Sequence, residues 1–130
     1  MRKDFKQWHD VKARIDALET LPLFREREIW WCYLGVNIGH EQDGGENFVR
    51  PVVVIKRYNL HACLIIPIIG RRKEGTYYFP LGQIRDRQTT ALLSQLRFID
   101  SRRLTKKIKK LSVPAFAALL KAIVRVNFDG

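Results

Sequence analysis

Near the N-terminus, apolar residues recur at steps of three and four. They are Trp8, Val11, Ile15 and Leu18, and this spacing predicts an amphipathic helix over residues 4–18. The helix is expected to end at Thr20-Leu21-Pro22, because proline disfavours helical backbone in the residue before it. Residues 1–22 are therefore predicted to form a helical extension.

The middle of the chain is rich in β-branched and aromatic residues, which predicts a sheet. The expected strands are residues 27–36, 52–55, 62–69, 76–81 and 89–99. The run at 62–69 is almost continuously apolar, which is typical of a strand buried on both faces. Residues that favour turns separate the strands, at Asp43-Gly44-Gly45, Tyr58-Asn59, Glu74-Gly75 and Leu81-Gly82.

A second helical pattern follows at residues 113–126, with Ser112 as the expected N-cap. Its apolar stripe consists of Phe116, Leu119, Leu120 and Ile123. The order of elements predicts an α+β fold, with a small, strongly twisted antiparallel sheet or a partly closed SH3-like barrel between an N-terminal and a C-terminal helix. The 130 residues suit one domain, with its core at 24–111.

The charge of the chain is strongly positive and unevenly placed. The formal net charge is +11, and 17 of the 24 Lys and Arg residues lie from Arg50 onward, against four acidic residues there. Such a field favours a polyanion or an acidic protein as partner. A basic surface that only improves solubility is the alternative.

The location and redox state follow from what the sequence contains. No apolar run reaches the ~20 residues of a membrane span, and the first ten residues do not resemble a signal peptide, so a cytoplasmic protein is expected. Cys32 and Cys63 lie in apolar runs and are expected to be buried free thiols. We expect no metal site and no cofactor, since the histidines lack the spacing of zinc ligands.

Arg50 is the first residue with a candidate chemical role. It enters a strand with Pro51, directly after the polar segment 39–49. An arginine so placed can grip a phosphate with two hydrogen bonds and stabilise developing negative charge. A surface salt bridge to Glu41 or Glu46 explains its position equally well.

Other polar residues could contact a polyanion. Arg71-Arg72-Lys73 follows a strand, and a second cationic cluster comprises Lys106, Lys107, Lys109 and Lys110, on a short helix or a twisted strand; both could be solvated surface. In the predicted strand 89–99, alternation places Gln95 and Arg97 on one side, opposite Ser94. Gln95 could read a base edge and Arg97 could hold a phosphate, or Arg97 could pair with Asp100.

Several fragments occur in a distinctive order: Arg27-Glu28-Ile29-Trp30, Gly39-x-Glu41-Gln42, Arg50-Pro51, Pro67 at a strand end, and Ser94-Gln95-Leu96-Arg97 followed by Asp100 and Arg103-Leu104. In this order and spacing they resemble the MazF/PemK family of toxins from type II toxin–antitoxin systems. The resemblance runs from about Phe24 to Leu111 and leaves out the N-terminal helix.

The resemblance implies a MazF/PemK/CcdB-like sheet of barrel-like curvature, a homodimer, and an antitoxin that blocks the active groove. It also implies metal-independent cleavage of single-stranded RNA, which leaves a 2′,3′-cyclic phosphate. Arg50 takes the position of the family's catalytic arginine. Glu41, Gln42 and Gln95 take positions that contact RNA, and Arg71, Arg72 and Arg97 are further candidates for RNA contacts.

The chain departs from the family pattern in two places. Pro67 is followed by Ile68, Ile69 and Gly70, where relatives carry a hydroxyl residue, and Ser94 stands where an acidic residue is frequent. Losing one transition-state donor costs about 10²–10³ in rate. Ser94 and Tyr77 are candidate replacements for that hydroxyl. The sequence therefore predicts an endoribonuclease toxin, and the alternative is a catalytically impaired module that binds RNA or an antitoxin. A toxin directed at DNA gyrase is disfavoured by the Arg-Pro and Gln-x-Arg elements.

Overall fold

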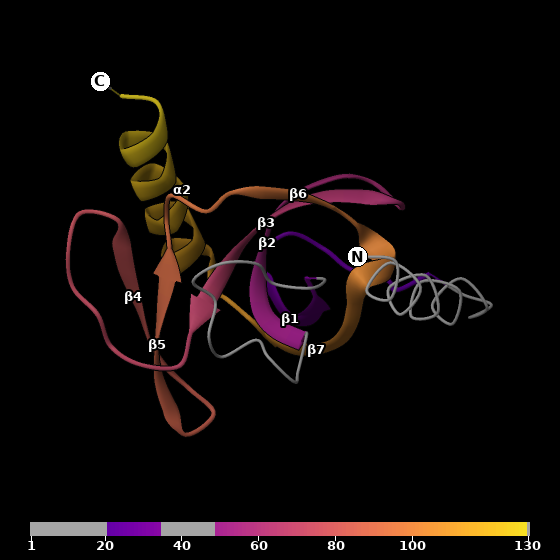
Figure 1. Ribbon diagram of the computed structural model, residues 1–130, viewed down its shortest axis with the longest axis horizontal. Helices are drawn as coiled ribbons and strands as arrows, with labels where there is room; N and C mark the ends of the chain where they lie inside the picture. Colours follow the sequence, from indigo (N-terminus) through magenta and orange to yellow (C-terminus); the bar gives the residue numbers. More distant parts are fainter. Residues whose placement is uncertain (1–20, 35–48, 130) are drawn as a thin grey trace, which may run out of the picture.

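The computed structural model describes residues 21–34 and 49–129, which form a curled antiparallel sheet with one helix packed on it (Figure 1). The strands are β1 Glu28–Tyr33, β2 Val49–Asn59, β3 Ala62–Ile69, β4 Tyr78–Ile84, β5 Arg87–Leu92, β6 Arg97–Asp100 and β7 Leu104–Lys110; a 3₁₀ turn, η1, covers Ser101–Arg103, and the helix α2 covers Val113–Asn127. The α+β prediction is confirmed for the sheet and the C-terminal helix. The predicted helix over 4–18 lies outside the described residues.

Strand β3 belongs to two parts of the sheet. The strand order is β4-β5-β3-β2-β1-β7, and β6 also pairs with β3. The first half of β3, Ala62–Ile65, pairs with β6, whereas Ile68 and Ile69 pair with β5. Strands β6, β3, β2, β1 and β7 therefore form the curled part, and the β4–β5 hairpin projects from the end of β3 (Figure 1).

The prediction of one strand over 89–99 is wrong, because the chain turns between β5 and β6. The backbone N–H of Gln95 donates to Leu92 O at 3.1 Å within this turn. Leu93 and Ile99, on either side of the turn, are both buried, so the hydrophobic pattern continues although the backbone changes neighbours. The alternation that placed Gln95 and Arg97 on one face therefore does not apply.

The predicted turn at Leu81-Gly82 is also wrong. Gly82 lies inside β4, at a register shift between Pro80 and Gly82, and its φ of 84° is one that glycine adopts without strain. The hairpin turns instead at Arg85-Asp86, the two residues between β4 and β5. Arg85 has a φ of 56°, in the left-handed region.

Two apolar cores hold the sheet together. One lies within the curled part and includes Phe24, Cys32, Val54 and Ile65; the other lies between the sheet and α2 and includes Ile29, Ile66, Phe116, Leu119 and Ile123. The predicted apolar stripe of the helix is thus the buried one. Ser112 is the N-cap, as predicted, and its Oγ accepts from the Ala115 N–H at 3.2 Å.

Both cysteines are free and buried, as expected. Burial raises the pKa of the Cys32 thiol and of the Cys63 thiol to about 12, so both are protonated at neutral pH. In the described ranges, no helix is long and apolar enough to cross a membrane.

Candidate functional site

Arg50, the second residue of β2, lies where β2 extends beyond β3. It is paired with Cys32 on β1, so its side chain leaves the sheet on the same face as Cys32. The side chain is half-buried, and it forms no hydrogen bond or ion pair with any residue in the described part of the chain. Glu41 and Glu46, the partners in the salt-bridge alternative, lie outside the described residues. Arg50 is therefore a guanidinium available to an anion.

Two further arginines approach the same end of β1. Nη2 of Arg97 donates to Leu34 O at 3.1 Å. Burial and the charge of Arg97 lower the pKa of Arg103, and both arginine charges act on the Cys32 thiol opposite Arg50. The structure thus brings Arg97, Arg103 and the backbone of Arg50 to one end of the curled sheet.

The alternative pair of Arg97 with Asp100 does not form. Asp100 instead binds Arg102, with Nη2 at 2.6 Å from Oδ2 and Nε at 3.0 Å from Oδ1. These hydrogen bonds lower the pKa of Asp100 more than burial raises it. The carboxylate is therefore occupied, and the guanidinium of Arg97 binds the backbone carbonyl of Leu34 instead.

The end of β3 contains the isoleucine and glycine that replace the expected hydroxyl residue. Ile69 is paired with Thr90 on β5. The Thr90 hydroxyl is fully buried; it donates to Arg71 O at 2.8 Å and accepts from the Lys73 N–H at 3.0 Å. The neighbouring Thr89 hydroxyl donates to Gly82 O at 2.9 Å. Both threonine protons are therefore used, that of Thr90 by the loop after β3 and that of Thr89 by strand β4.

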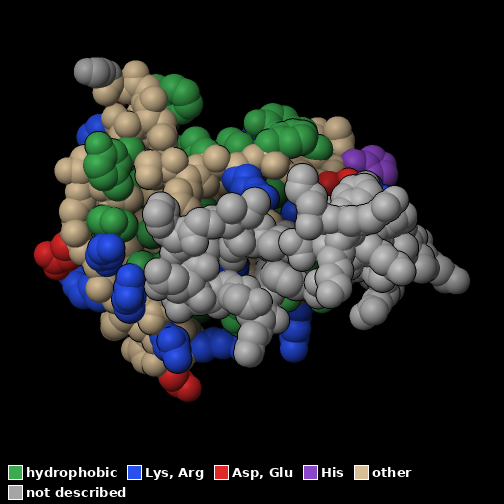
Figure 2. Space-filling view, in the orientation of Figure 1, with side chains coloured by type: hydrophobic (Ala, Val, Ile, Leu, Met, Phe, Trp, Pro, Cys, Tyr) green, Lys and Arg blue, Asp and Glu red, His purple; other side chains and the backbone are tan. Residues whose placement is uncertain are grey.

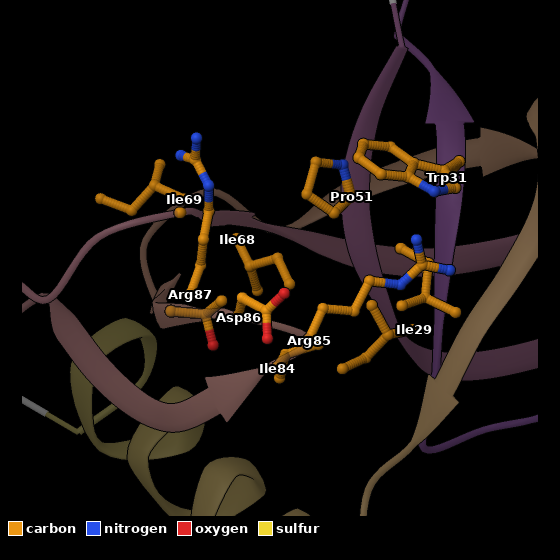
Figure 3. Close-up of a pocket in the computed structure, with 12 residues that line it drawn as sticks. Ile29, Trp31, Pro51, Ile68, Ile69, Ile84, Arg85, Asp86 and Arg87 are labelled. Carbon is orange, nitrogen blue, oxygen red and sulfur yellow. The ribbon is translucent and has the colours of Figure 1, made fainter.

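A cavity of about 520 Å³ opens between β2 and the β4–β5 hairpin. The pairing of β2 with β3 ends at Val52 and Pro67, because the residues of β3 after Pro67 pair with β5 instead. The apolar wall of the cavity is formed by Ile29, Trp31, Pro51, Ile68, Ile84 and Ile108. Pro51, which follows Arg50, is on this wall together with the Trp31 ring (Figure 3).

The rim of the cavity is charged. Arg85, Asp86 and Arg87 come from the tip of the β4–β5 hairpin, and all three are exposed (Figure 3). Lys and Arg side chains gather over this hairpin in Figure 2. Gly70 leaves room for Arg87, because a Cβ at Gly70 would lie 3.2 Å from both Cδ and Nη1 of that arginine.

The other predicted residues are spread more widely. Tyr77 and Ser94 lie at the opposite end of the β4–β5 hairpin from Arg87: the Leu93 N–H donates to Tyr77 O at 2.9 Å, and Tyr78 pairs with Leu92. Ser94 is four residues beyond Thr90, the partner of Ile69, so the structure does not bring it or Tyr77 to Ile69.

The predicted RNA contacts differ in their surroundings. Arg71, Arg72 and Gln95 are exposed. Arg72 binds Glu74 at 2.9 Å, and both side chains are mostly exposed. Glu74 therefore competes only weakly with other anions for Arg72. Glu41 and Gln42 lie outside the described residues. The lysine cluster at 106–110 lies on a strand, β7, and not on a short helix.

The family is decided by a comparison with models of known protein families. The model described as "PemK-like, MazF-like toxin of type II toxin-antitoxin system" matches residues 25–126, most of the chain. The chain belongs to this family. The resemblance inferred from the sequence is thereby confirmed. A search of curated protein sequences finds no match.

Solved structures of MazF toxins share the fold of this family member. A MazF structure from Deinococcus radiodurans matches with a TM-score of 0.63 at 21% identity, over 83% of this chain and 97% of that one. The Mycobacterium tuberculosis toxin MazF-mt6 matches with a TM-score of 0.59 at 18% identity, over 77% and 95%. An endoribonuclease from a mycobacterial species, solved in complex with its cognate antitoxin, matches with a TM-score of 0.60 at 8% identity, over 78% and 91%.

Sequence reasoning missed Arg85, Arg87 and Arg103 as candidate functional residues of this toxin-family chain. Arg85 and Arg87 were overlooked because the hairpin turn was expected at Leu81-Gly82. A usable signal was present: Arg85-Asp86 are polar residues between two stretches of strand-forming residues. Arg103 was noted only as part of a motif. Within the described ranges, no group of three or more His, Cys, Asp or Glu residues could hold a metal ion.

Proposed function

We propose that this member of the toxin family is a metal-independent endoribonuclease that cuts single-stranded RNA in the cytoplasm. The observation that carries the proposal is the Arg50 side chain, which has no partner among the described residues and lies at the point where β3 leaves β2. Arg97 and Arg103 add positive charge at the same end of β1. A phosphodiester placed there would meet several cations.

The proposed reaction uses the RNA as its own nucleophile. The ribose 2′-oxygen bonds to the adjacent phosphorus and gives up its proton to water, and the bond from phosphorus to the 5′-oxygen breaks. That oxygen takes up a proton, so the products carry a 2′,3′-cyclic phosphate and a 5′-hydroxyl. Arg50 would donate hydrogen bonds to the phosphate oxygens as their negative charge grows. The reaction needs no metal, because neither the nucleophile nor the leaving group has to be generated by one.

The absence of a hydroxyl residue at the end of β3 is expected to lower the rate of RNA cleavage. Ile69 cannot donate or accept a hydrogen bond through its side chain, and the protons of Thr89 and Thr90 are used elsewhere. Ser94 remains a candidate on sequence grounds only. The second candidate function, a catalytically impaired module that binds RNA or an antitoxin, is favoured by this one observation. We therefore propose a nuclease that cuts RNA slowly, or one in which another side chain replaces the missing hydroxyl.

We also propose two protein partners, a second copy of the chain and a cognate antitoxin. Structures with this fold include an endoribonuclease in complex with its cognate antitoxin and a MazE-MazF structure from Deinococcus radiodurans. Exposed apolar side chains at Tyr58, Leu60 and Phe98 offer surface for such contacts, and Figure 2 shows hydrophobic side chains over β6. RNA contacts are assigned to Glu41, Gln42, Arg71, Arg72, Gln95 and Arg97.

The test is an RNA digest with the ends mapped. Purified full-length protein is incubated with a mixture of long RNAs in EDTA, and new termini are identified by sequencing and by their chemistry. Cleavage that survives EDTA and leaves cyclic phosphate and 5′-hydroxyl ends supports the proposal. A requirement for magnesium, or 5′-phosphate ends, contradicts the mechanism. Binding without any cleavage favours the second candidate.

A further inference from the structure

The β4–β5 hairpin presents two arginines whose side chains have no structural task in the described part of the chain. Neither the side chain of Arg85 nor that of Arg87 forms a hydrogen bond or ion pair with a described residue, even though Asp86 lies between them in the sequence. Unpaired cations at the rim of a concave site favour an anionic ligand. Asp86 reduces the net charge of the rim but leaves both guanidinium groups available.

The backbone of Arg85 is held in a conformation that suits glycine better. Its φ of 56° places a long side chain in the left-handed region, which most residues avoid. Arg27, with a φ of 79°, is also left-handed, but its Nε donates to Leu111 O at 3.1 Å and its backbone bonds to β2 and Leu111. Arg27 thus has a structural reason for its conformation. For Arg85 the reason is the two-residue hairpin turn, because the favoured forms of this turn need a positive φ at their first residue; the case for a role therefore rests on its unpaired side chain.

Below this rim the cavity is apolar and aromatic. Its volume of about 520 Å³ lies within the range of roughly 300–1,000 Å³ that is typical of small-ligand sites. Trp31 and Pro51 offer flat surface on one side, Arg87 stands on the other, and the side chain of Arg85 reaches across the cavity toward Ile29 (Figure 3). A nucleotide has the matching two parts, a flat base and a charged phosphate.

We propose that the cavity between β2 and the β4–β5 hairpin is a nucleotide subsite for single-stranded RNA, in which a base packs against Trp31 and Pro51 while Arg85 and Arg87 hold the adjoining phosphate. This inference rests on the proposed function, because it gives the same RNA a second contact site, on the face of β2 that Pro51 presents and opposite the face of the Arg50 side chain. Gly70 contributes to this subsite, because the absence of a side chain at Gly70 lets Arg87 lie across the end of β3.

The test measures how binding depends on salt. The probe is a fluorescently labelled, mixed-sequence 2′-O-methyl oligoribonucleotide, which cannot be cleaved because its 2′-oxygen is blocked. Its affinity for the full-length protein is followed by anisotropy across a potassium chloride series. A phosphate contact adds about 0.7 to the log–log slope for single strands, so Arg87→Ala should lower the slope by about that amount and weaken binding about fivefold at ~0.1 M salt.

The base contact has a different signature. Trp31→Ala should weaken binding by about tenfold with the salt slope unchanged, because stacking involves no released counterion. Trp31→Phe keeps an aromatic ring and should retain most of the affinity, which separates stacking from damage to the fold. Arg125→Ala is the matched control: Arg125 is exposed on α2, no residue of α2 lines the cavity, and the same charge is lost. It should stay within about twofold of the unmodified protein, since distant charges are screened.

The outcomes separate this inference from the function on which it rests. If the unmodified protein binds the probe and Arg87→Ala has the same affinity and slope, the subsite is wrong while the proposed nuclease stands. Equal losses in Arg87→Ala and Arg125→Ala also contradict it, because general charge would then explain binding. Failure of the unmodified protein to bind overturns both. Binding with the predicted slopes but no cleavage of natural RNA supports the subsite and contradicts the nuclease.

Discussion

The side chain of Arg87 occupies the space that a side chain at Gly70 would need: a Cβ there would lie 3.2 Å from Cδ and from Nη1. Gly70→Ala should therefore push Arg87 away from the end of β3 without breaking the fold, because the crowded atoms belong to a flexible, exposed arm. We expect the free energy of unfolding to stay the same or to rise by up to about 1 kcal/mol, since alanine restricts the unfolded chain. RNA binding should weaken. Urea unfolding and probe anisotropy measure the two effects.

A double variant is the control for this prediction. If Gly70→Ala acts by displacing Arg87, then adding it to Arg87→Ala should cause little further loss of binding. Additive losses would mean that Gly70 contributes to RNA binding by another route.

Arg85→Gly should change stability and binding in opposite directions. Glycine adopts a φ of 56° without strain, and relief of a left-handed arginine is worth about 1 kcal/mol. The melting temperature should rise or hold, while RNA binding weakens because a phosphate contact is lost. Thermal unfolding followed by circular dichroism, together with the anisotropy titration, gives both quantities. A variant that is less stable and binds equally well would show that Arg85 is present for the fold.

Glu28 is a buried carboxylate with three partners, and it makes stability depend on pH. Burial raises its pKa, but hydrogen bonds from Trp30 Nε1 and the Arg25 N–H, each at 2.9 Å, and the Lys107 ammonium at 3.1 Å lower it below its ordinary value of 4.5 overall. A lowered folded pKa means that the charged form stabilises the fold above pH 4.5 and that this contribution is lost as the pH falls through the folded pKa.

Glu28→Gln keeps an oxygen for Trp30 and Arg25 but sets an amide donor against Lys107. Because Lys107 is half exposed, we expect a modest loss, about 1 kcal/mol at pH 7. The loss should shrink at pH 3, because the stabilisation by the ionised form declines once the pH falls below the ordinary pKa of 4.5. Urea unfolding at the two pH values measures it, with Glu74→Gln, at an exposed pair, as the control. An equal loss at both pH values would show that the ionised form of Glu28 is not what stabilises the fold.

Ile69→Thr should raise the rate of RNA cleavage. Both residues are β-branched, so the end of β3 should accept the change with little strain. The new hydroxyl could donate to the scissile phosphate, and a tenfold gain needs only ~1.4 kcal/mol of added transition-state stabilisation. Initial rates on one RNA at equal protein concentrations measure this. If the unmodified protein cuts efficiently and Ile69→Thr adds nothing, another group, with Arg87 the nearest candidate, supplies the donor.

Local patterns predicted the elements that depend on neighbours in the sequence. The helix at Val113–Asn127 follows from Ser112 and the stripe that includes Phe116 and Leu119, and β3 follows from the apolar run that begins at Ala62. The break between β5 and β6 could not be predicted in this way. Leu93 and Ile99 continue one buried pattern, and only the three-dimensional pairing shows that β5 and β6 use different halves of β3.

The same distinction between local patterns and three-dimensional pairing applies to the residues of the candidate site. Arg50 could be predicted because it stands beside Pro51, and a motif is a local property. Arg87 could not, since its importance depends on Gly70, which lies 17 positions earlier and meets it through the pairing of β3 with β5. The free guanidinium of Arg85 could not be predicted either, because its exposure follows from a turn that was expected four residues earlier.

The central claim, that Arg50 is the centre of an RNA-cleaving site, is tested most directly by one comparison in EDTA. The unmodified protein, Arg50→Ala and Arg50→Lys are incubated with the same RNA at equal concentrations, and new 2′,3′-cyclic phosphate ends are counted over time. Arg50 is half-buried and unpaired among the described residues, so its truncation should leave the fold intact, which the melting temperature verifies. The account predicts new ends with the unmodified protein, none with Arg50→Ala, and no rescue by lysine, which lacks the two-pronged donor. Cleavage by Arg50→Ala at the unmodified rate would contradict it.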